Sequence, residues 1–236
     1  MIVNLIEKLV QKQDLTFDES KSAMRLIMEG EATPSQFGSL ITALRMKGET
    51  VDEVSGMASV MRSMSLHVQT KNVLIDTCGT GGDGFGTFNI STAAAFVAAG
   101  AGQKIAKHGN RAMSSKSGSA DVLEALGVNI QLLPDQISKC IEKTGFGFMF
   151  AQSFHPSMKY AAGPRREMGI RTVFNLLGPL TNPAGAARQI IGVSDPTVGA
   201  LMAEALGRLG SERALVVHGD DGLDEITIST SSTVWD

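Results

Sequence analysis

The sequence predicts an α/β protein of two parts, a small N-terminal helical domain and a larger α/β domain with a mostly parallel central sheet. Three observations support this prediction. Helix start signals repeat within residues 1–66, strand-like and helix-like segments alternate from residue 73 onward, and the last strand-like segment ends six residues before the chain does. We therefore expect a helical domain at 1–66, joined by helices from about 156–180, and an α/β domain at 73–236 that is truncated at its C-terminal end.

Composition narrows the class of protein. Of the 236 residues 43% are hydrophobic and 19% are charged, which is typical of a globular chain with a substantial core. A formal net charge of -3 argues against nucleic acid as a partner. No run of about 18 apolar residues occurs, so no membrane segment is expected. Cys78 and Cys140 lie far apart and lack metal-ligand spacing, which favours a cytoplasmic location.

The first 66 residues predict four helices. Residues 2–10 repeat apolar side chains at the spacing of one helical face. Three later helices begin with a capping box, in which a threonine hydroxyl and a Glu or Gln three residues later satisfy free N–H groups. The boxes are Thr16 with Glu19, Thr33 with Gln36, and Thr50 with Glu53. The apolar faces exceed what four short helices can bury, so we expect a dimer interface or docking onto the second domain.

From residue 73 the chain alternates strands and helices with short links. Strands are expected at 73–77, 104–107, 129–133, 146–151, 189–193, 213–217 and 226–230, and helices at 90–101, 120–126, 135–143, 156–168, 173–177 and 196–209. Such alternation is typical of a parallel sheet with crossover helices.

A glycine-rich loop follows the first expected strand. It places five glycines in eight positions: Gly79, Gly81, Gly82, Gly84 and Gly86. Glycines let the backbone approach an anion closely, and the helix that follows opens with Asn89, Ser91 and Thr92. Phosphate or pyrophosphate is the ligand that this pattern favours, and a glycine turn without ligand is the alternative.

The loop also satisfies the G-x-G-x-x-G pattern of dinucleotide-binding proteins, which by itself is a weak signal. That class needs an acidic residue at the end of the second strand, where this chain has Lys107 and His108. Asp83 within the loop would also repel a bare pyrophosphate. The context therefore disfavours a nicotinamide cofactor.

Two further clusters could serve a phosphorylated ligand. Lys107, His108, Asn110 and Arg111 follow a neighbouring strand, with the hydroxyls of Ser114, Ser115 and Ser119 just after them. A solvated basic loop is the alternative. Asp224 and Glu225 are adjacent hard oxygen ligands suited to Mg²⁺, whereas Asp220 and Asp221 could equally form a polar turn. Arg165 could bind a substrate carboxylate or form a surface salt bridge.

These motifs together resemble the anthranilate phosphoribosyltransferases, within the class of nucleoside-phosphorylase-like phosphoribosyltransferases. The resemblance rests on Asp76-Thr-Cys-Gly-Thr-Gly-Gly-Asp83, Asn89-Ile-Ser-Thr92, Lys107-His-Gly-Asn-Arg111, Gly118-Ser-Ala-Asp121, Gly163-Pro-Arg165, residues 174–183 and Asp221-Gly-Leu-Asp-Glu225. It implies transfer of the phosphoribosyl group from phosphoribosyl pyrophosphate (PRPP) to anthranilate, with Mg²⁺ as cofactor, in a cytoplasmic homodimer formed through the helical domain.

The resemblance also implies roles for residues of this chain. PRPP would be held by Gly79, Gly82, Asp83, Thr87, Asn89, Ser91, Thr92, Lys107, Ser115 and Ser119. Anthranilate would be held by Asn110 and Arg165, and Mg²⁺ by Ser91, Asp224 and Glu225. Lys107, His108, Asn110 and Arg165 would serve the chemistry, His108 as an acceptor of the amine proton.

Two alternatives remain within the resemblance. A pyrimidine nucleoside phosphorylase would need an Arg with a downstream Ser-x-x-x-Lys, and this spacing is absent between Arg165 and Asp195. A non-catalytic, nucleic-acid-binding relative would favour a basic surface, whereas the sequence pI is about 5.8. Family members are considerably longer, so we expect the 236-residue chain to show little turnover.

Overall fold

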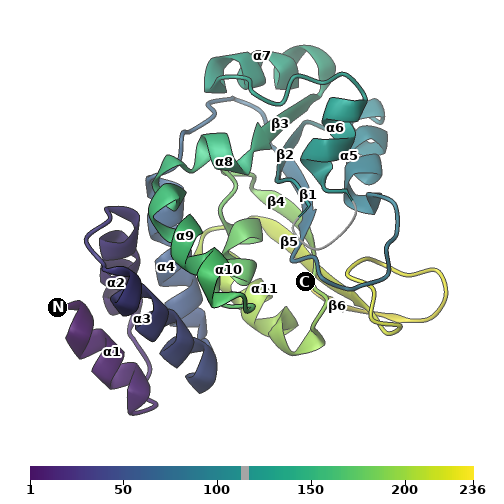
Figure 1. Cartoon of the computed structure of the whole chain (residues 1–236). Coiled ribbons are helices and arrows are strands. Elements are labelled where there is room, and N and C mark those ends of the chain that lie inside the picture. The colour runs from purple at the N-terminus through teal and green to yellow at the C-terminus, as the bar shows by residue number, and fades with distance from the viewer. Residues whose placement is uncertain (113–116) are drawn as a thin grey trace. The chain divides into compact units, whose positions relative to one another are not determined.

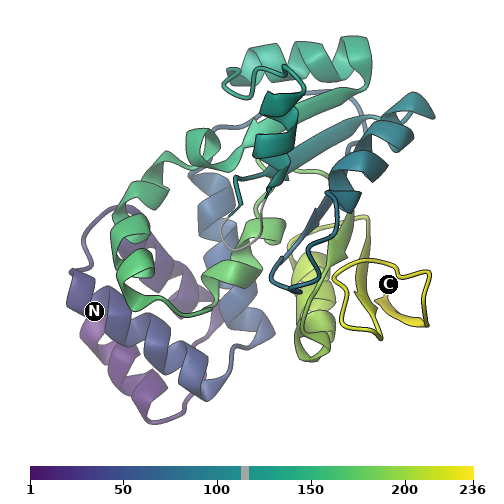
Figure 2. The ribbon, with the colours of Figure 1, turned by 45° about the vertical axis from the view of Figure 1, so that its right-hand side comes forward.

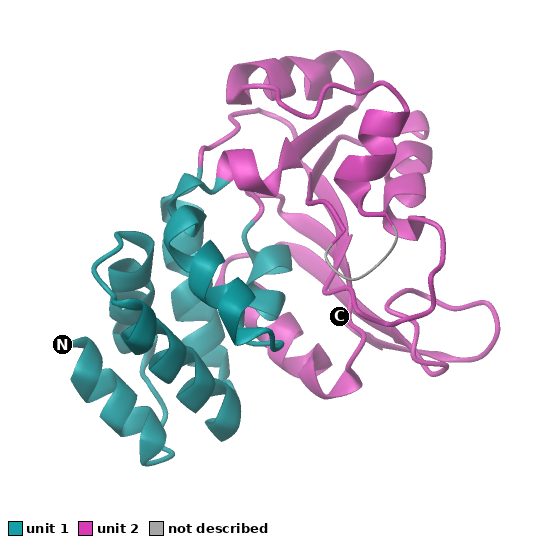
Figure 3. Cartoon of the chain, viewed as in Figure 1, with its two compact units in different colours: residues 1–65, 155–181 teal, residues 66–154, 182–236 magenta. Residues whose placement is uncertain are grey.

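The structure is a computed structural model and describes residues 1–112 and 117–236. The chain divides into two compact units (Figure 3). Unit 1 comprises Met1–Ser65 and His155–Thr181, and unit 2 comprises Leu66–Phe154 and Asn182–Asp236. No helix among the described residues is both long enough and apolar enough to span a lipid bilayer.

Unit 1 is helical. Its first segment forms α1 (Ile2–Val10), α2 (Phe17–Met28), α3 (Pro34–Lys47) and α4 (Val51–Ser63), all within the range where four helices were predicted. Its second segment forms α9 (Lys159–Met168) and α10 (Phe174–Leu177), flanked by 3-10 turns at Pro156–Met158 and Gly178–Leu180. The Phe37 and Phe174 rings stack with centroids 5.6 Å apart, so the two segments share one core.

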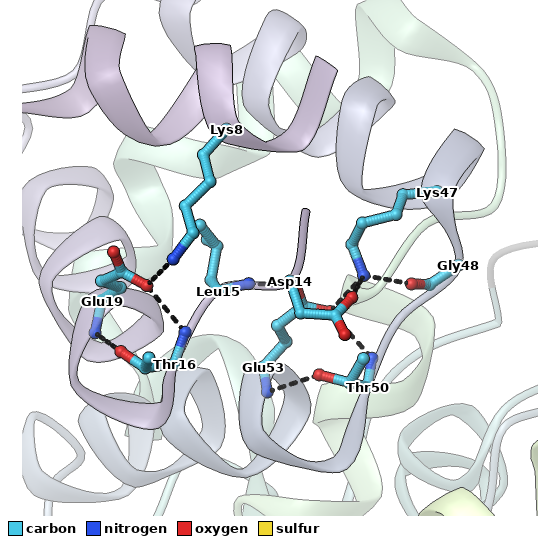
Figure 4. A network of polar contacts seen from close by, with 9 residues as sticks. All are labelled: Lys8, Asp14, Leu15, Thr16, Glu19, Lys47, Gly48, Thr50 and Glu53. Carbon is cyan, nitrogen blue, oxygen red and sulfur yellow. Dashed lines mark hydrogen bonds and ion pairs between the residues drawn. The ribbon is translucent and has the colours of Figure 1, made fainter. Parts of the chain in front are cut away.

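All three predicted capping boxes are formed, and one of them is buried. The Glu53 carboxylate accepts the Thr50 N–H at 2.8 Å and the Leu15 N–H at 2.9 Å (Figure 4). Lys47 donates to the same carboxylate at 3.0 Å and to Asp14 at 2.7 Å. This group therefore joins the turn before α2, the end of α3 and the start of α4.

Unit 2 contains one six-stranded sheet. Its strands are β1 (Ile75–Gly79), β2 (Ile105–Gly109), β3 (Phe146–Phe150), β4 (Arg188–Gly192), β5 (Arg213–Gly219) and β6 (Ser232–Trp235). Their order across the sheet is β3-β2-β1-β4-β5-β6. The first five strands run parallel, and β6 pairs antiparallel with β5. The mostly parallel sheet predicted from the alternation is confirmed.

Helices cover both faces of the sheet, as parallel strands require. The helices of unit 2 are α5 (Ile90–Gly100), α6 (Ser119–Ala125), α7 (Pro134–Thr144), α8 (Ala151–Phe154) and α11 (Gly199–Arg208), with a 3-10 turn at Pro196–Val198. On β3, Met149 packs with residues of α7 while Phe148 and Phe150 pack with residues of α6. Because successive strand side chains point to opposite faces, α6 and α7 lie on opposite sides (Figures 1 and 2).

Two predicted strands are wrong. Residues 129–133 form no strand, because the Asn129 side chain accepts the Gln131 N–H at 2.9 Å and the Leu133 N–H caps α7 by donating to Gln136 at 2.8 Å. Residues 226–230 form none either, because side-chain oxygens take up the local N–H groups: Thr227 N–H donates to Ser232 at 3.1 Å. The last strand is β6, a few residues later and antiparallel.

Candidate active site

The loop that leaves β1 and enters α5 provides the first wall of the site. Four of its glycines have left-handed φ angles: Gly81 at 62°, Gly82 at 85°, Gly84 at 78° and Gly86 at 65°. Other residues rarely adopt this region, so the course of the loop depends on these glycines. Asp83 shapes the turn by accepting the Phe85 N–H at 3.2 Å. Thr87 is exposed near the end of this loop.

The topology explains why this loop is a natural binding place. From β1 the chain continues to β2 and β3 on one side, and it later returns to β4 and β5 on the other. Open α/β sheets bind ligands at such a reversal, outside the carboxyl ends of the strands. Ser194, just after β4, donates to the Gly81 carbonyl at 3.0 Å, and the Thr80 N–H donates to Gly192 at 2.9 Å. The glycine loop is thus fixed at the reversal.

Asp224 and its neighbour Glu225 form an acidic segment, and Asp224 holds this segment against the glycine loop. Its Oδ2 accepts the Gly81 N–H at 3.0 Å. A Cβ placed at Gly79 would lie 3.0 Å from the same oxygen, and one at Gly192 would lie 1.6 Å from the Asp224 carbonyl. Glycine is therefore needed at position 192, and any larger residue at position 79 would press against the Asp224 carboxylate.

Crowding of carboxylates changes their acidity. Burial raises the pKa of Asp224 to about 6, and the nearby Asp83 carboxylate adds to the rise. Burial also raises the pKa of Glu225 to about 7, with Asp224 adding to it, whereas Lys107 and a hydrogen bond from the Ser91 backbone act in the opposite direction. A cation placed here would relieve this repulsion.

Asp220 and Asp221 do not join this cluster of carboxylates. Thr227 Oγ1 donates to Asp221 at 2.7 Å, and Thr233 Oγ1 donates to Asp220 at 3.3 Å. Both carboxylates therefore hold the turn after β5 together, as the polar-turn interpretation predicts.

Lys107 lies within β2 rather than at its end, and only 1% of its surface is exposed. Its ammonium donates to the Thr77 carbonyl and to Ser91 Oγ, the latter at 3.2 Å. Burial lowers the pKa of Lys107, and the carboxylates of Asp76 and Glu225 only partly offset this. Among the described residues, no carboxylate forms an ion pair with Lys107. A buried ammonium thus lies at the N-terminal end of α5, next to the acidic segment.

The second loop, after β2, is tied to the starts of α5 and α6. Asn89 donates to the Ser117 carbonyl at 3.2 Å, and Thr92 Oγ1 lies 3.2 Å from Ser119 Oγ. Asn110 is exposed, and its carbonyl accepts the Ala120 N–H at 3.2 Å. The predicted ligand Ser115 lies outside the described residues.

Two basic side chains of this region have other partners. Arg111 forms ion pairs with Asp121 at 3.0 Å and with Glu124 at 2.5 Å. Lys104 donates to the last carbonyls of α7, including Glu142 at 3.0 Å. Of the described lysines and arginines in this region, Lys107 is therefore the one whose side chain contacts β1 and the start of α5. His108 is buried in β2 and donates its backbone N–H to Asp76 at 3.2 Å.

Arg165 belongs to α9 and therefore to unit 1. Its guanidinium lies over the Phe174 ring, 4.8 Å from the centroid. Burial lowers the pKa of Arg165, and among the described residues it forms no ion pair. The salt-bridge alternative for this residue is therefore wrong within that part of the chain.

Sequence reasoning missed a buried pair beneath the site. Asp76 is fully buried in β1, and its Oδ2 accepts a hydrogen bond from Asn182 at 2.8 Å. An acidic residue inside an otherwise apolar strand was the available signal. Its partner is 106 positions away, in a segment that the sequence marks only as rich in breakers.

No three His, Cys, Asp or Glu side chains of the described residues converge into a complete metal cage. Mg²⁺ is usually held by one or two carboxylates together with waters and substrate phosphates. The pair Asp224 and Glu225, with pKa values raised by burial and mutual repulsion, supplies donors of this kind. The donor set fits a magnesium ion that arrives with a phosphorylated ligand.

Comparisons with known proteins agree over both units. The helical bundle domain model of a glycosyl transferase family matches residues 3–65, and the a/b domain model of that family matches residues 71–236. An anthranilate phosphoribosyltransferase of Acetivibrio thermocellus is 60% identical over 235 residues, which are 99% of this chain and 68% of that protein. One of Moorella thermoacetica is 58% identical and covers 99% of this chain and 69% of its own.

Solved structures show the same similarity. The anthranilate phosphoribosyltransferase of Thermus thermophilus has a TM-score of 0.89 at 46% identity, covering 98% of this chain and 72% of its own. That of Saccharomyces cerevisiae, in complex with PRPP and Mg, has a TM-score of 0.91 at 32% identity, covering 99% of this chain and 70% of its own. Another structure of the yeast enzyme contains 4-fluoroanthranilate.

Proposed function

This chain belongs to the anthranilate phosphoribosyltransferase family, and from that premise we propose how its residues carry out the family's reaction. The reaction, a step of tryptophan biosynthesis, breaks the bond from ribose C1 of PRPP to pyrophosphate and forms a bond from C1 to the amine of anthranilate. The products are N-(5-phosphoribosyl)-anthranilate and pyrophosphate. One observation carries the proposal: the glycine loop, the start of α5, Lys107 and the acidic segment meet at one edge of the sheet.

The leaving pyrophosphate is the first chemical demand. The loop N–H groups and the positive end of α5 favour an anion. The pyrophosphate would lie against Gly79, Gly82 and Asp83 of the loop. Hydroxyl and amide contacts to PRPP would come from Thr87, Asn89, Ser91, Thr92 and Ser119. The resemblance assigns Ser115 the same role. Lys107 would stabilise the negative charge that develops on the leaving oxygens. Its freedom from any ion pair within the described residues leaves its charge available.

We propose that Ser91, Asp224 and Glu225 hold Mg²⁺ when PRPP binds. The ion would supply charge neutralisation for the pyrophosphate. The support from this chain is the crowding of Asp83, Asp224 and Glu225, which leaves two carboxylates with raised pKa values. The support from a relative is the yeast structure that contains both PRPP and Mg.

The acceptor needs positioning more than activation. An arylamine is unprotonated at neutral pH, so no side chain has to attack covalently. Arg165 would hold the anthranilate carboxylate, and Asn110 would orient the ring substituents. His108 would accept the amine proton late in the reaction. The pairing of Arg165 with an aromatic ring rather than with a carboxylate supports its assignment.

We also propose a cytoplasmic homodimer that forms through unit 1. Exposed apolar side chains of α1 and α3 support a subunit contact: Val3 is 60%, Val10 is 63% and Met46 is 81% exposed. Cys78 and Cys140 are both free thiols, which suits a reducing compartment. Analytical ultracentrifugation should give twice the chain mass, and a monomer at micromolar concentration would contradict the dimer.

Calorimetry of the purified chain tests the proposed ligand. PRPP with Mg²⁺ should bind at one site per chain, and PRPP without Mg²⁺ should bind more weakly. In a form of the protein as long as its relatives, where turnover is expected, loss of anthranilate fluorescence should require PRPP and Mg²⁺ together. In this longer form, Arg165→Ala should raise the KM for anthranilate about 10-fold or more, the loss expected for a charged hydrogen bond. The exposed neighbour Arg166→Ala is the matched control and should leave this KM unchanged.

The opposite outcome would favour the alternative phosphorylase. Turnover of thymidine with phosphate, combined with no binding of PRPP, would contradict the proposed reaction. The named relatives favour the transferase over both that alternative and a nucleic-acid-binding protein.

A further inference from the structure

Strands β1 and β2 separate just below the site. β1 pairs with β4 through all five of its residues, and β2 pairs with β3 through all five of its own. Between β1 and β2 only Ile75 and Ile105 are in register. If the pairing continued, Thr77 would lie opposite Lys107. The two strands instead diverge at the point where both approach the glycine loop.

Side chains replace the ladder hydrogen bonds lost at this split. The His108 N–H donates to Asp76 at 3.2 Å, and the Ala106 carbonyl accepts a hydrogen bond from Asn182 at 2.8 Å. The Thr77 carbonyl accepts from the Lys107 ammonium. Unpaired backbone groups are costly when buried, so these side chains are what allow the strands to remain apart.

Asp76 and Asn182 are joined to each other as well. The Asn182 amide donates to Asp76 at 2.8 Å, and its oxygen accepts the Ala184 N–H at 2.9 Å. Asp76 is 0% exposed and Asn182 is 3% exposed. Every polar atom of the Asn182 amide is therefore engaged, and its position fixes that of the Asp76 carboxylate.

The separation of β1 and β2 makes room for the Lys107 ammonium between the two strands. From β2 the side chain reaches across to Thr77, with 3.4 Å to its hydroxyl, and to the hydroxyl of Ser91 at the start of α5. Of the surrounding groups, Asp76 does most to favour the charged form of Lys107, and the two form no ion pair within the described residues. The carboxylate can thus compensate the buried ammonium while leaving it free to meet an anion.

We propose that Asp76, held by Asn182, is a positioning residue that keeps β1 and β2 apart and so directs the Lys107 ammonium toward the pyrophosphate of PRPP. The inference rests on the proposed function, since it assigns a role within the same site. A positioning role for Asp76 differs from a purely structural role in one respect. The position of the Lys107 ammonium, rather than the overall stability of the chain, should depend on the Asp76 carboxylate.

Calorimetric titration of the whole chain with PRPP in the presence of Mg²⁺ tests the inference. Asp76→Asn preserves volume but removes the charge and sets two amide donors face to face. We expect the dissociation constant to rise about 10- to 100-fold, by analogy with the loss caused by mutating a group that orients a metal ligand.

Glu53→Gln is the matched control, because Glu53 is another fully buried carboxylate near a lysine, and it lies in unit 1. It should lower the melting temperature without changing the affinity for PRPP. The stoichiometry of each titration gives the folded fraction, so the affinity is measured even if a variant folds poorly. Asn182→Ala, which leaves both strands unmutated, is the second variant and should also weaken binding.

Three results would overturn the inference. Unchanged affinity in Asp76→Asn and Asn182→Ala would do so while leaving the proposed function intact. Affinity losses that follow the melting temperature equally in Glu53→Gln and Asp76→Asn would reduce Asp76 to a structural role. Failure of the wild-type chain to bind PRPP with Mg²⁺ would overturn both the inference and the proposed function.

Discussion

Two buried lysines show how differently the two units use charge. In unit 1, Lys47 is 5% exposed at its side chain and pairs with Glu53 at 3.0 Å and Asp14 at 2.7 Å (Figure 4). Burial by itself would lower the pKa of Lys47, but its hydrogen bonds to Asp14 and Glu53 raise it. The surroundings thus favour the charged form.

In unit 2, Lys107 is more fully buried, and hydroxyl and carbonyl oxygens are its partners. Burial lowers its pKa, and the surrounding negative charges do not reverse the shift. Its surroundings therefore favour the charged form less than those of Lys47 do. The comparison teaches that a lysine in ion pairs with carboxylates stabilises the fold. A lysine without an ion pair can instead bind the anionic group of a ligand.

The largest expected effect is on the stability of unit 1. Glu53→Ala should lower the free energy of unfolding by about 4 kcal/mol, because the buried Lys47 ammonium loses one of its two carboxylate partners and two backbone N–H groups lose their acceptor. Chemical denaturation followed by circular dichroism measures this loss. A change below about 1 kcal/mol, the value typical of an exposed ion pair, would show that burial does not strengthen this network.

The stability of unit 1 should also depend on pH, through a buried histidine whose surroundings disfavour its charged form. Burial lowers the pKa of His155 in unit 1 to about 4, against an opposing hydrogen bond with the Thr181 backbone. Between pH 6.5 and 4 the unfolded chain binds more protons than the folded one. The contribution of His155 to stability is therefore complete above pH 6.5 and is lost as the pH falls toward 4, by about 3 kcal/mol in total. His155→Gln should flatten this part of the unfolding profile, and an unchanged slope would contradict the assignment.

The smallest expected effect concerns the exposed counterpart of the Glu53 network. Thr16 and Glu19 form the same capping box, but Lys8 and Glu19 are 29% and 34% exposed at their side chains. Thr16→Ala should cost about 1 kcal/mol of unfolding free energy, the usual value of one N-cap. Equal losses in Thr16→Ala and Glu53→Ala would contradict the idea that burial separates the two boxes.

Local features of the fold were predictable from sequence, and long-range ones were not. The capping boxes depend on residues three apart, so Thr16, Thr33 and Thr50 identified their helices correctly. The strand predicted at 129–133 failed because Asn129 offers its side chain to the backbone in place of a neighbouring strand. The pairing of β6 with β5 depends on a turn held by Asp220 and Asp221, which periodicity does not reveal.

The candidate site divides in the same way. Glycine content predicted the loop, and the position of Lys107 one strand away predicted that it lies near that loop, as its bonds to Thr77 and Ser91 confirm. The roles of the site residues in binding stay predictions. The split between β1 and β2, held by Asp76 and Asn182, needs the sheet order and could not be derived from residues so far apart in sequence.

The unfolding free energies of Lys47→Met and Lys107→Met, each measured with and without PRPP and Mg²⁺, test the central claim most directly. A ligand at 100 times its dissociation constant stabilises a protein by about 2.7 kcal/mol. We predict that Lys47→Met is the less stable variant and keeps this full increment, whereas Lys107→Met stays closer to wild type and loses most of it. A Lys107→Met variant that is less stable than Lys47→Met but is stabilised by PRPP as strongly as wild type would contradict the account.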